Sequence, residues 1–502
     1  MRADSKKTSR YQAPTDVVYK KELGMSSILF KDINLIDANG VHTPHAYVGV
    51  RDGVIDYVGK LDPLANQDDS SDGLSDDPLD GLTNDPSNDL SDGLTNDLPG
   101  GLSDLSASAR SYEETYDGRG KILMPGLYNA HSHVPMTLLR GLGENLPLDK
   151  WLNDAIFPFE ALMTDKDSYY ATLAGFAEMI RFGVVSCTDM YYHSEARAKA
   201  IIESGIKCNL GHSVLDFDPD ISYDQIPEAA KNEELFKEYH GAGEGRLLID
   251  FNLHAEYTST EKVVEGLAQA AEQAGVRMQV HVAETASEVE GCKERHAGKT
   301  PVEYLADCGL FDVPATAAHC VWLTENDRRI LAEKKVFVAT CPASNAKLGS
   351  GIAQVKAMLE AGITVALGTD GVASNNAHNM FRDMYLLALM ERAHNHTPLG
   401  LTSSEIIQIA TRNGALSQGR EDCGDVKVGN RADLVVLASD TPWMVPCDDL
   451  TGALVYSAQG SDVILTMVDG KVLYKDGMYT TIDIERALAE VTASRKRIMA
   501  QL

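Results

Sequence analysis

Apolar residues in this chain fall into short runs separated by segments with helical spacing, and the alternation begins near residue 122. Helix-period segments lie between the runs, for example 261–274, 325–334 and 352–361. The runs with the length of buried strands are 122–133, 184–190, 207–216, 247–254, 278–284, 315–321, 336–342 and 364–370. Strands that alternate with helices form parallel sheets, so these eight repeats predict an α/β fold, a (β/α)8 TIM barrel.

The segments on either side of the barrel have a different pattern. Residues 28–37 and 47–59 predict strands, and Asp52-Gly53 inside the second segment is typical of a hairpin turn. After a predicted helix at 402–413, residues 426–437 and 463–473 return to strands. Apolar positions at a spacing of three to four residues predict a closing helix in 481–502.

The chain therefore divides into segments of distinct character. Residues 61–110 are rich in Asp, Gly, Ser, Asn and Pro, which predicts a disordered acidic insertion at the position of a hairpin loop. Repeated Asp and Gly also suggest calcium loops, but the spacing fits neither an EF-hand nor the nonapeptide repeat. The expected divisions are a disordered extension (1–24), N-terminal strands (25–60 and 111–121), the insertion (61–110), the barrel (122–415), C-terminal strands (416–480) and the helix (481–502).

Composition narrows the class of protein. A hydrophobic content of 44% and a charged content of 24% are those of a globular protein. The net charge of −29 argues against nucleic acid as a partner, because phosphates need a basic surface. We expect no membrane association, because no apolar run reaches about 18 residues. The eight cysteines include no CxxC pair, and the N-terminus lacks an apolar signal core, so we expect a cytoplasmic protein with reduced thiols.

Candidate metal ligands lie at the ends of the predicted strands. His131 and His133 are two residues apart, so on a strand both imidazoles point to the same side. An HxH pair alone is common by chance. His281 and Asp370 end two later runs, and together the four residues make an N/N/N/O set that leaves a position open for water. Because all four lie at the carboxyl ends of barrel strands, where barrel chemistry is located, they predict one site.

Five segments together carry a resemblance to a known family. They are PGLYNAHSHVPMTLLRG, HVAETASE, AAHCVWL, CPASNAKLGSGIA and LGTDGVASNN. Read together, they resemble the amidohydrolase superfamily, and within it the branch of methylthioadenosine/S-adenosylhomocysteine deaminases and the related triazine chlorohydrolases. The resemblance runs from about Met25 to the C-terminus, with one interruption. It implies that the two sets of flanking strands form one small β-sandwich split around the barrel, and that the protein is a homo-oligomer.

The resemblance also implies roles for the site residues. One divalent metal, zinc (Zn²⁺) or alternatively Fe²⁺, is held by four ligands: His131, His133, His281 and Asp370. Glu284 protonates the ring nitrogen beside the attacked carbon, and His319 contacts the nucleophile, while Asp370 also accepts a proton from the water. Without the resemblance, a surface glutamate and a core histidine are the ordinary interpretations of Glu284 and His319.

Residues matched by motif indicate the substrate. Trp151 corresponds to the tryptophan that lines the base pocket, Glu160 to the glutamate that holds the ribose hydroxyls, and His254 to a histidine near the sugar and base. Helix packing and a solvated helix surface are the ordinary alternatives for Trp151 and Glu160. Where relatives that act on S-adenosylhomocysteine place an arginine for its carboxylate, this chain has His212. A carboxylate prefers a guanidinium partner, so a neutral 5′ substituent is expected.

These features predict a metal-dependent deaminase that converts the 6-amino group of an adenosine derivative, a small-molecule substrate, and releases ammonia. By the resemblance, Glu284 favours deamination over dechlorination. Two alternatives stay open at this point. One is a deaminase, hydrolase or chlorohydrolase of another aminated heterocycle, such as guanine, a pterin or a triazine. The other is a catalytically silent binding scaffold, because a fold does not by itself imply a function.

Overall fold

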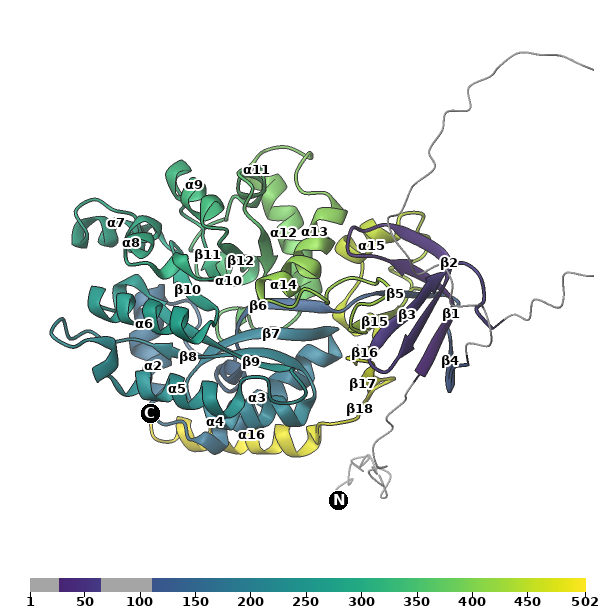
Figure 1. Cartoon of the computed structure of the whole chain (residues 1–502), viewed down its shortest axis with the longest axis horizontal. Helices are drawn as coiled ribbons and strands as arrows, with labels where there is room; N and C mark the ends of the chain where they lie inside the picture. Colours follow the sequence, from purple (N-terminus) through teal and green to yellow (C-terminus); the bar gives the residue numbers. More distant parts are fainter. Residues whose placement is uncertain (1–26, 65–110) are drawn as a thin grey trace, which may run out of the picture.

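The computed structural model describes residues 27–64 and 111–502. Within them lie a parallel barrel and a smaller mixed sheet, which Figure 1 shows next to each other. The extension predicted at 1–24 lies outside the described residues, and so does the predicted insertion beyond Leu64. The predictions of disorder for these two segments therefore stay predictions.

The larger part is a closed ring of parallel strands. Its strands are β6 (Leu127–His133), β7 (Val184–Tyr191), β8 (Lys207–Val214), β9 (Leu247–Ala255), β10 (Met278–Val282), β11 (Ala315–His319), β12 (Phe337–Thr340), β13 (Val365–Leu367) and β14 (Asp370–Gly371). β13 pairs with β12, whereas β14, which follows β13 almost directly, pairs with β6. Residues 365–371 therefore act as one eighth strand that closes the ring, and the predicted (β/α)8 barrel is confirmed.

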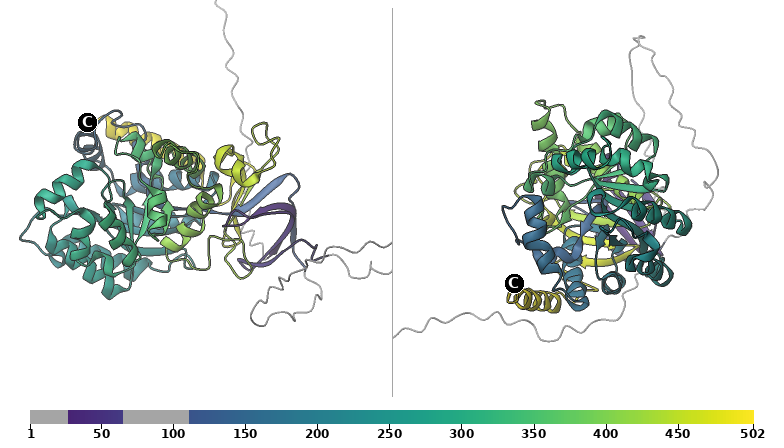
Figure 2. Two further views of the ribbon diagram at one scale, coloured as in Figure 1. Left: turned by 90° about the horizontal axis from the view of Figure 1, so that it is seen from above. Right: turned by 90° about the vertical axis from the view of Figure 1, so that its left-hand side faces the viewer.

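Helices surround the ring, as the end-on view in Figure 2 shows. They are α3 (Asp165–Arg181), α4 (Ser194–Ser204), α5 (Pro227–Tyr239), α6 (Glu261–Ala274), α7 (Ala286–Arg295), α8 (Pro301–Asp307), α9 (Glu325–Glu333), α10 (Pro342–Lys347), α11 (Val355–Glu360), α12 (Met380–His394), α13 (Ser403–Ala410) and α14 (Arg412–Ser417). Local signals set several ends: the Thr324 hydroxyl accepts the Asp327 N–H at the start of α9, and Gly275 in the left-handed region ends α6.

The smaller part is one continuous mixed sheet of nine strands built from both ends of the described chain. The N-terminal strands are β1 (Ser27–Ile36), β2 (His42–Arg51), β3 (Val54–Gly59), β4 (Glu114–Asp117) and β5 (Lys121–Pro125). The C-terminal strands are β15 (Leu434–Ala438), β16 (Val463–Val468), β17 (Lys471–Lys475) and β18 (Met478–Tyr479). β5 pairs with β1 on one side and with β15 on the other, so the predicted split origin of this part is confirmed.

The boundary between the two parts differs from the predicted one at residue 122. Residues 121–125 form β5 of the small sheet, and the barrel begins only at Leu127. Gly126 connects the two parts: its N–H donates to the Asp433 carbonyl, and a side chain there would collide with Val185. The buried Lys207 ammonium at the start of β8 contacts Asp433 (2.5 Å) and Asp469 (2.8 Å), so the sheet lies against the amino-terminal end of the barrel.

Two further helices follow the barrel. α15 (Leu450–Tyr456) precedes β16 and lies outside every predicted helix. α16 (Ile484–Met499) lies within the predicted closing segment and runs along α3, on the outside of the barrel (Figure 1). Among residues 27–64 and 111–502, no helix is both long and apolar enough to cross a membrane.

Candidate active site

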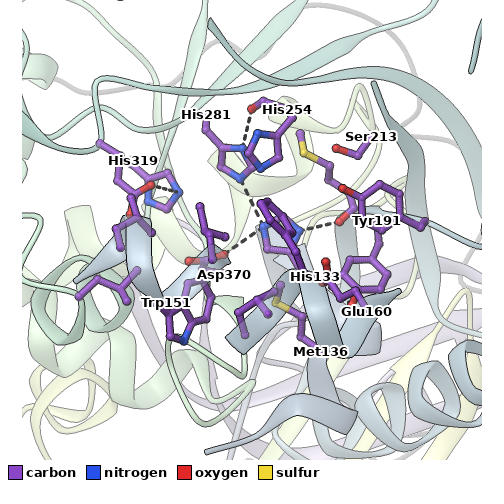
Figure 3. A pocket seen from close by; sticks show the side chains of 18 of the residues that line it. His133, Met136, Trp151, Glu160, Tyr191, Ser213, His254, His281, His319 and Asp370 are labelled. Atoms are coloured by element: carbon purple, nitrogen blue, oxygen red, sulfur yellow. Dashed lines mark hydrogen bonds and ion pairs between the residues drawn. The ribbon is translucent and has the colours of Figure 1, made fainter. Parts of the chain in front are cut away.

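A cavity opens at the carboxyl end of the barrel and contains most of the predicted site residues (Figure 3). Its empty volume is about 640 Å³, a figure that includes the open solvent at its mouth. Its polar lining consists of His133, Glu160, Tyr191, Tyr192, Ser213, His254, Tyr257, His281, Glu284, His319 and Asp370. The remaining wall is apolar and includes Trp151, Phe157, Met136 and Leu348.

Hydrogen bonds to the Nδ1 atom fix the orientation of the imidazole in three of the predicted ligands. The Nδ1 atom of His131 lies 2.9 Å from Gln279 Oε1, that of His133 2.6 Å from the Met190 carbonyl, and that of His281 2.6 Å from the His254 carbonyl. A carbonyl oxygen can only accept, so each Nδ1 carries the proton. Each Nε2 atom therefore has a free lone pair.

The three Nε2 atoms meet beside one carboxylate. His133 Nε2 and His281 Nε2 are 3.3 Å apart, and Asp370 Oδ1 lies 3.2 Å from His133 Nε2 and 3.6 Å from His131 Nε2. His131 Nε2 is fully buried without a hydrogen-bond partner among the described residues. Facing lone pairs repel each other unless a cation lies between them, so this donor set fits a divalent metal ion. Burial also lowers the pKa of His131 and His281, which keeps both imidazoles neutral.

Asp370 is held as an anion. Ser344 Oγ donates to its Oδ2 at 2.5 Å, Ser374 Oγ donates to the same atom at 2.8 Å, and the Gly371 N–H donates to Oδ1 at 2.7 Å. Burial opposes ionisation, but the contacts with His131 and His133 lower the pKa of Asp370 well below its usual range. Its φ of 60° lies in the left-handed region, a strained conformation that is common at functional sites.

Glu284 and His319 face the same end of the cavity. Their nearest atoms, Glu284 Oε2 and His319 Nε2, are 3.9 Å apart, and both side chains are more than nine-tenths buried. Ser350 Oγ donates to Glu284 Oε1 at 3.1 Å. Burial raises the pKa of Glu284, partly offset by His319. A carboxyl group with a raised pKa beside a cation site is suited to carrying a proton.

Trp151 and Glu160 are on one irregular helix that forms a wall of the cavity. α1 (Leu148–Lys150), the π-helical turn η3 (Trp151–Ile156) and α2 (Phe157–Glu160) follow one another without a break. Tyr191 Oη donates to Glu160 Oε1 at 2.6 Å. Burial raises the pKa of Glu160 to about 7. π-helical turns are rare and occur frequently at functional sites.

His254 lines the cavity, and burial lowers its pKa to about 4. The structure does not place His212 in the cavity wall. Successive side chains on a strand point to opposite faces, so Ser213 faces the cavity while His212 faces the helix layer and pairs with Ser194 Oγ at 2.9 Å. Burial lowers the pKa of His212 to about 3, so this histidine supplies no cation to a substrate. We therefore correct the expectation that it contacts the substrate directly.

Several residues of the site were absent from the sequence-based set. Gln279 precedes His281 by two residues, so strand alternation alone could have placed it on the inner face. Tyr191 and Tyr257 also line the cavity, together with Glu160 and His254, which the motifs did identify. Glu288 accepts the backbone N–H groups of Ala283 and Glu284, each at 2.7 Å, and so holds the loop that carries Glu284. The only sequence signal for this role is the position of Glu288 in the first turn of α7.

The fold and the site define a barrel protein that gathers three histidines and an aspartate, candidate metal ligands, at the carboxyl ends of its strands. Residues 122–473 match the sequence profile of the amidohydrolase family, and the chain belongs to this family. The resemblance seen in the sequence is thereby confirmed.

Named relatives and solved structures extend the comparison. The chain is 40% identical over 377 residues to a 5-methylthioadenosine/S-adenosylhomocysteine deaminase of Desulfitobacterium hafniense, covering 75% of this chain and 86% of the relative. It is 38% identical over 393 residues to a 5′-deoxyadenosine deaminase of Methanosarcina mazei, covering 78% and 90%. An adenosine deaminase of Xanthomonas campestris with bound zinc superposes with a TM-score of 0.80 at 26% identity, over 94% of this chain and 98% of that one. A zinc-bound atrazine chlorohydrolase of Arthrobacter aurescens shares the fold, with a TM-score of 0.77 at 23% identity over 93% and 100%.

Proposed function

We propose that this protein is a metal-dependent deaminase that replaces the 6-amino group of an adenosine derivative by oxygen and releases ammonia. The observation that carries the proposal is the cavity itself. Its lining combines His133, His281 and Asp370 with Glu284, and it also includes the Glu160–Tyr191 pair and aromatic rings that suit a nucleoside. The names of the relatives at 38–40% identity support the same reaction.

His131, His133, His281 and Asp370 would hold one divalent ion, and we propose zinc, with Fe²⁺ as the alternative. The convergent lone pairs and the unpartnered His131 Nε2 support this set. A bound metal of this kind supplies a nucleophile at neutral pH by lowering the pKa of water to around 7. The zinc-bound state of the Xanthomonas campestris protein supports the choice of metal.

The protons of water are carried by the chain's own residues. Glu284 takes the first proton and delivers it to the ring nitrogen N1 while the carbon–oxygen bond forms at C6. Asp370 takes the second proton and passes it to the amino group, and the carbon–nitrogen bond then breaks to release ammonia. His319 accepts a hydrogen bond from the nucleophile through its free Nε2 atom, because its Nδ1–H donates to Asn345 Oδ1 at 2.8 Å.

The cavity wall suits a ribose and a neutral 5′ substituent. An ionised Glu160 accepts two ribose hydroxyls, which a deoxy sugar cannot replace. None of the cavity-lining residues in the described chain is lysine or arginine. Arg140 pairs with Glu178, and Arg246 pairs with Glu244 at 2.9 Å before the start of β9, so neither supplies the missing cation. We therefore propose methylthioadenosine, 5′-deoxyadenosine or adenosine as substrates ahead of S-adenosylhomocysteine.

The alternatives differ from this proposal in specific features. The Glu160–Tyr191 pair favours a nucleoside over a triazine, because a triazine has no ribose for Glu160 to bind. A silent scaffold would not need the convergent ligand set together with Glu284. A homo-oligomer and a cytoplasmic location stay predictions from the resemblance and the sequence.

The test is a panel of purine nucleosides monitored by ammonia release and by the absorbance change from adenine to hypoxanthine. We expect kcat/KM for methylthioadenosine to exceed that for S-adenosylhomocysteine by about tenfold or more, since one charged hydrogen bond is missing for the carboxylate. Equal or inverted values would refute the neutral 5′ assignment. Activity on guanine or a triazine alone would refute the nucleoside assignment, and no activity with full metal content would favour the scaffold.

Glu284 has a separate test. Glu284→Gln keeps the shape of the side chain but cannot carry a proton, so turnover should fall by roughly 10²–10⁴. The metal content should stay at the wild-type level, measured by elemental analysis. Loss of metal together with activity would make Glu284 a ligand and contradict its role as proton carrier.

A further inference from the structure

One segment contacts all three proposed proton-handling residues. Residues 341–351, here named the support segment, leave the end of β12, form α10 and turn back toward the cavity. Three of its side chains, each at most 4% exposed, bond to the site: Ser344 to Asp370 at 2.5 Å, Asn345 to His319 at 2.8 Å and Ser350 to Glu284 at 3.1 Å. These partners come from the ends of three different strands or the loops after them.

The support segment is held by hydrogen bonds within it and by hydrogen bonds from other parts of the barrel. The Asn345 N–H donates to the Cys341 carbonyl, and the Ser350 N–H donates to the Asn345 carbonyl, both at 2.9 Å. Trp322 Nε1 donates to the Ser350 carbonyl at 2.7 Å. The Ala343 N–H donates to Asp383 Oδ1 at 3.2 Å. A segment held in this way can impose an orientation on the groups that it contacts.

The contact with Asn345 determines which tautomer of His319 is favoured. Because Asn345 Oδ1 accepts the Nδ1–H of His319, the tautomer with a free Nε2 is favoured, and that atom faces Glu284. Ser350 similarly holds one oxygen of Glu284 and leaves the other oxygen directed toward His319. Leu348, between these two residues in the chain, lines the substrate cavity.

We propose that Asn345 and Ser350 are positioning residues that align His319 and Glu284 for proton transfer, an inference that rests on the proposed deaminase function. Neither side chain lines the cavity or belongs to the ligand set. Their removal should therefore lower kcat and leave substrate binding and metal binding unchanged. Supporting bonds of this kind contribute about 10–100-fold to activity.

The test for Ser350 is a double-mutant cycle with Glu284. Ser350→Ala should lower kcat by about 10–100-fold in the wild-type background, with KM and metal equivalents unchanged. In the Glu284→Gln background the same substitution should change kcat by less than about twofold, because the group through which Ser350 acts no longer carries a proton. Equal losses in both backgrounds would overturn the proposal for Ser350.

Asn345 is tested by a conservative rescue. Asn345→Ala should lower kcat by a similar factor, whereas Asn345→Asp keeps an acceptor for Nδ1–H and should recover most of the loss, with a shifted pH profile. Asn232 provides a matched control, because it is fully buried and donates to Tyr223 Oη at 3.1 Å, and neither residue lines the cavity. Asn232→Ala should change the melting temperature but not kcat.

Two results would overturn the proposal for Asn345: no rescue by aspartate, or loss of metal from Asn345→Ala. The deaminase function and the positioning role can be tested separately. A wild-type protein that releases no ammonia from any nucleoside overturns the proposed function and this inference together. An active wild type whose Ser350 and Glu284 losses are additive overturns only the inference.

Discussion

The Gln279 side chain links His131, one of the proposed metal ligands, to the backbone of the first barrel strand. Its Oε1 atom accepts from His131 Nδ1 and its Nε2 atom donates to the Ala130 carbonyl, both at 2.9 Å. We expect Gln279→Leu to weaken metal affinity by about 10–100-fold, because His131 then loses the bond that fixes its tautomer. Competition with a chelator measures the affinity.

Gln418 is the matched control for Gln279. It is also a fully buried glutamine in the barrel, and its Nε2 donates to the Asn129 carbonyl at 3.1 Å, but it contacts none of the four proposed ligands. Gln418→Leu should lower the melting temperature without changing metal affinity. Unchanged affinity in Gln279→Leu would contradict an orienting role for Gln279.

Glu160 predicts a pH dependence of substrate binding. Its pKa is raised to about 7 by burial, so the ionised form, which accepts two hydroxyls, dominates only above that value. KM for adenosine should therefore fall as the pH rises from about 6 to about 8. A 2′,3′-dideoxy analogue should show no such fall, and Glu160→Gln should remove it. The same KM profile in Glu160→Gln would assign the titration to another group.

At the scale of elements, α12 is joined to α10 through a buried acid. Asp383 on α12 accepts the Ala343 N–H at 3.2 Å and bonds Asn375 Nδ2 at 3.1 Å. Burial raises its pKa from 3.8 to about 7. Between these values the folded protein binds more protons than the unfolded chain, so the free energy of unfolding falls as the pH rises through this window.

Asp383→Asn should remove this dependence while keeping the acceptor for Ala343. At pH 8 we expect the variant to be more stable than the wild type by on the order of 1–3 kcal/mol, and at pH 4 the difference should shrink. Thermal unfolding at the two pH values measures it. Parallel pH profiles for the two proteins would show that Asp383 is ionised in the folded state at both pH values.

Elements with strong local signals could be predicted from the sequence, and those defined by distant partners could not. The helix predicted at 261–274 has the observed bounds, because its apolar period and its final glycine are local. The run 122–133 was predicted as one strand, although it is two, because only the pairing of β5 with β15 assigns residues 121–125 to the small sheet. The His131–Gln279 bond likewise depends on strand registry, which the sequence does not contain.

At the scale of the whole molecule, the cavity and the strands that flank residues 65–110 lie at opposite ends of the barrel. β3 and β4, the strands before and after residues 65–110, belong to the small sheet at the amino-terminal end of the barrel (Figure 1). Replacing residues 65–110 by a short Gly-Ser turn should therefore leave kcat and KM unchanged within about twofold, since loop length changes loop-closure entropy only slowly. A large rise in KM would show that the segment reaches the substrate.

The split origin of the small sheet has a consequence for biosynthesis. The chain leaves the ribosome from its N-terminus, so β1, β2, β3 and β5 emerge long before β15. Until β15 arrives, the edge of β5 that it will cover offers unpaired N–H and carbonyl groups to any passing strand. All proposed metal ligands precede β15, so a nascent chain carries the complete ligand set before its sheet can close. A chain truncated before residue 434 would therefore keep this edge exposed to chaperones and proteases, even if its active site were complete.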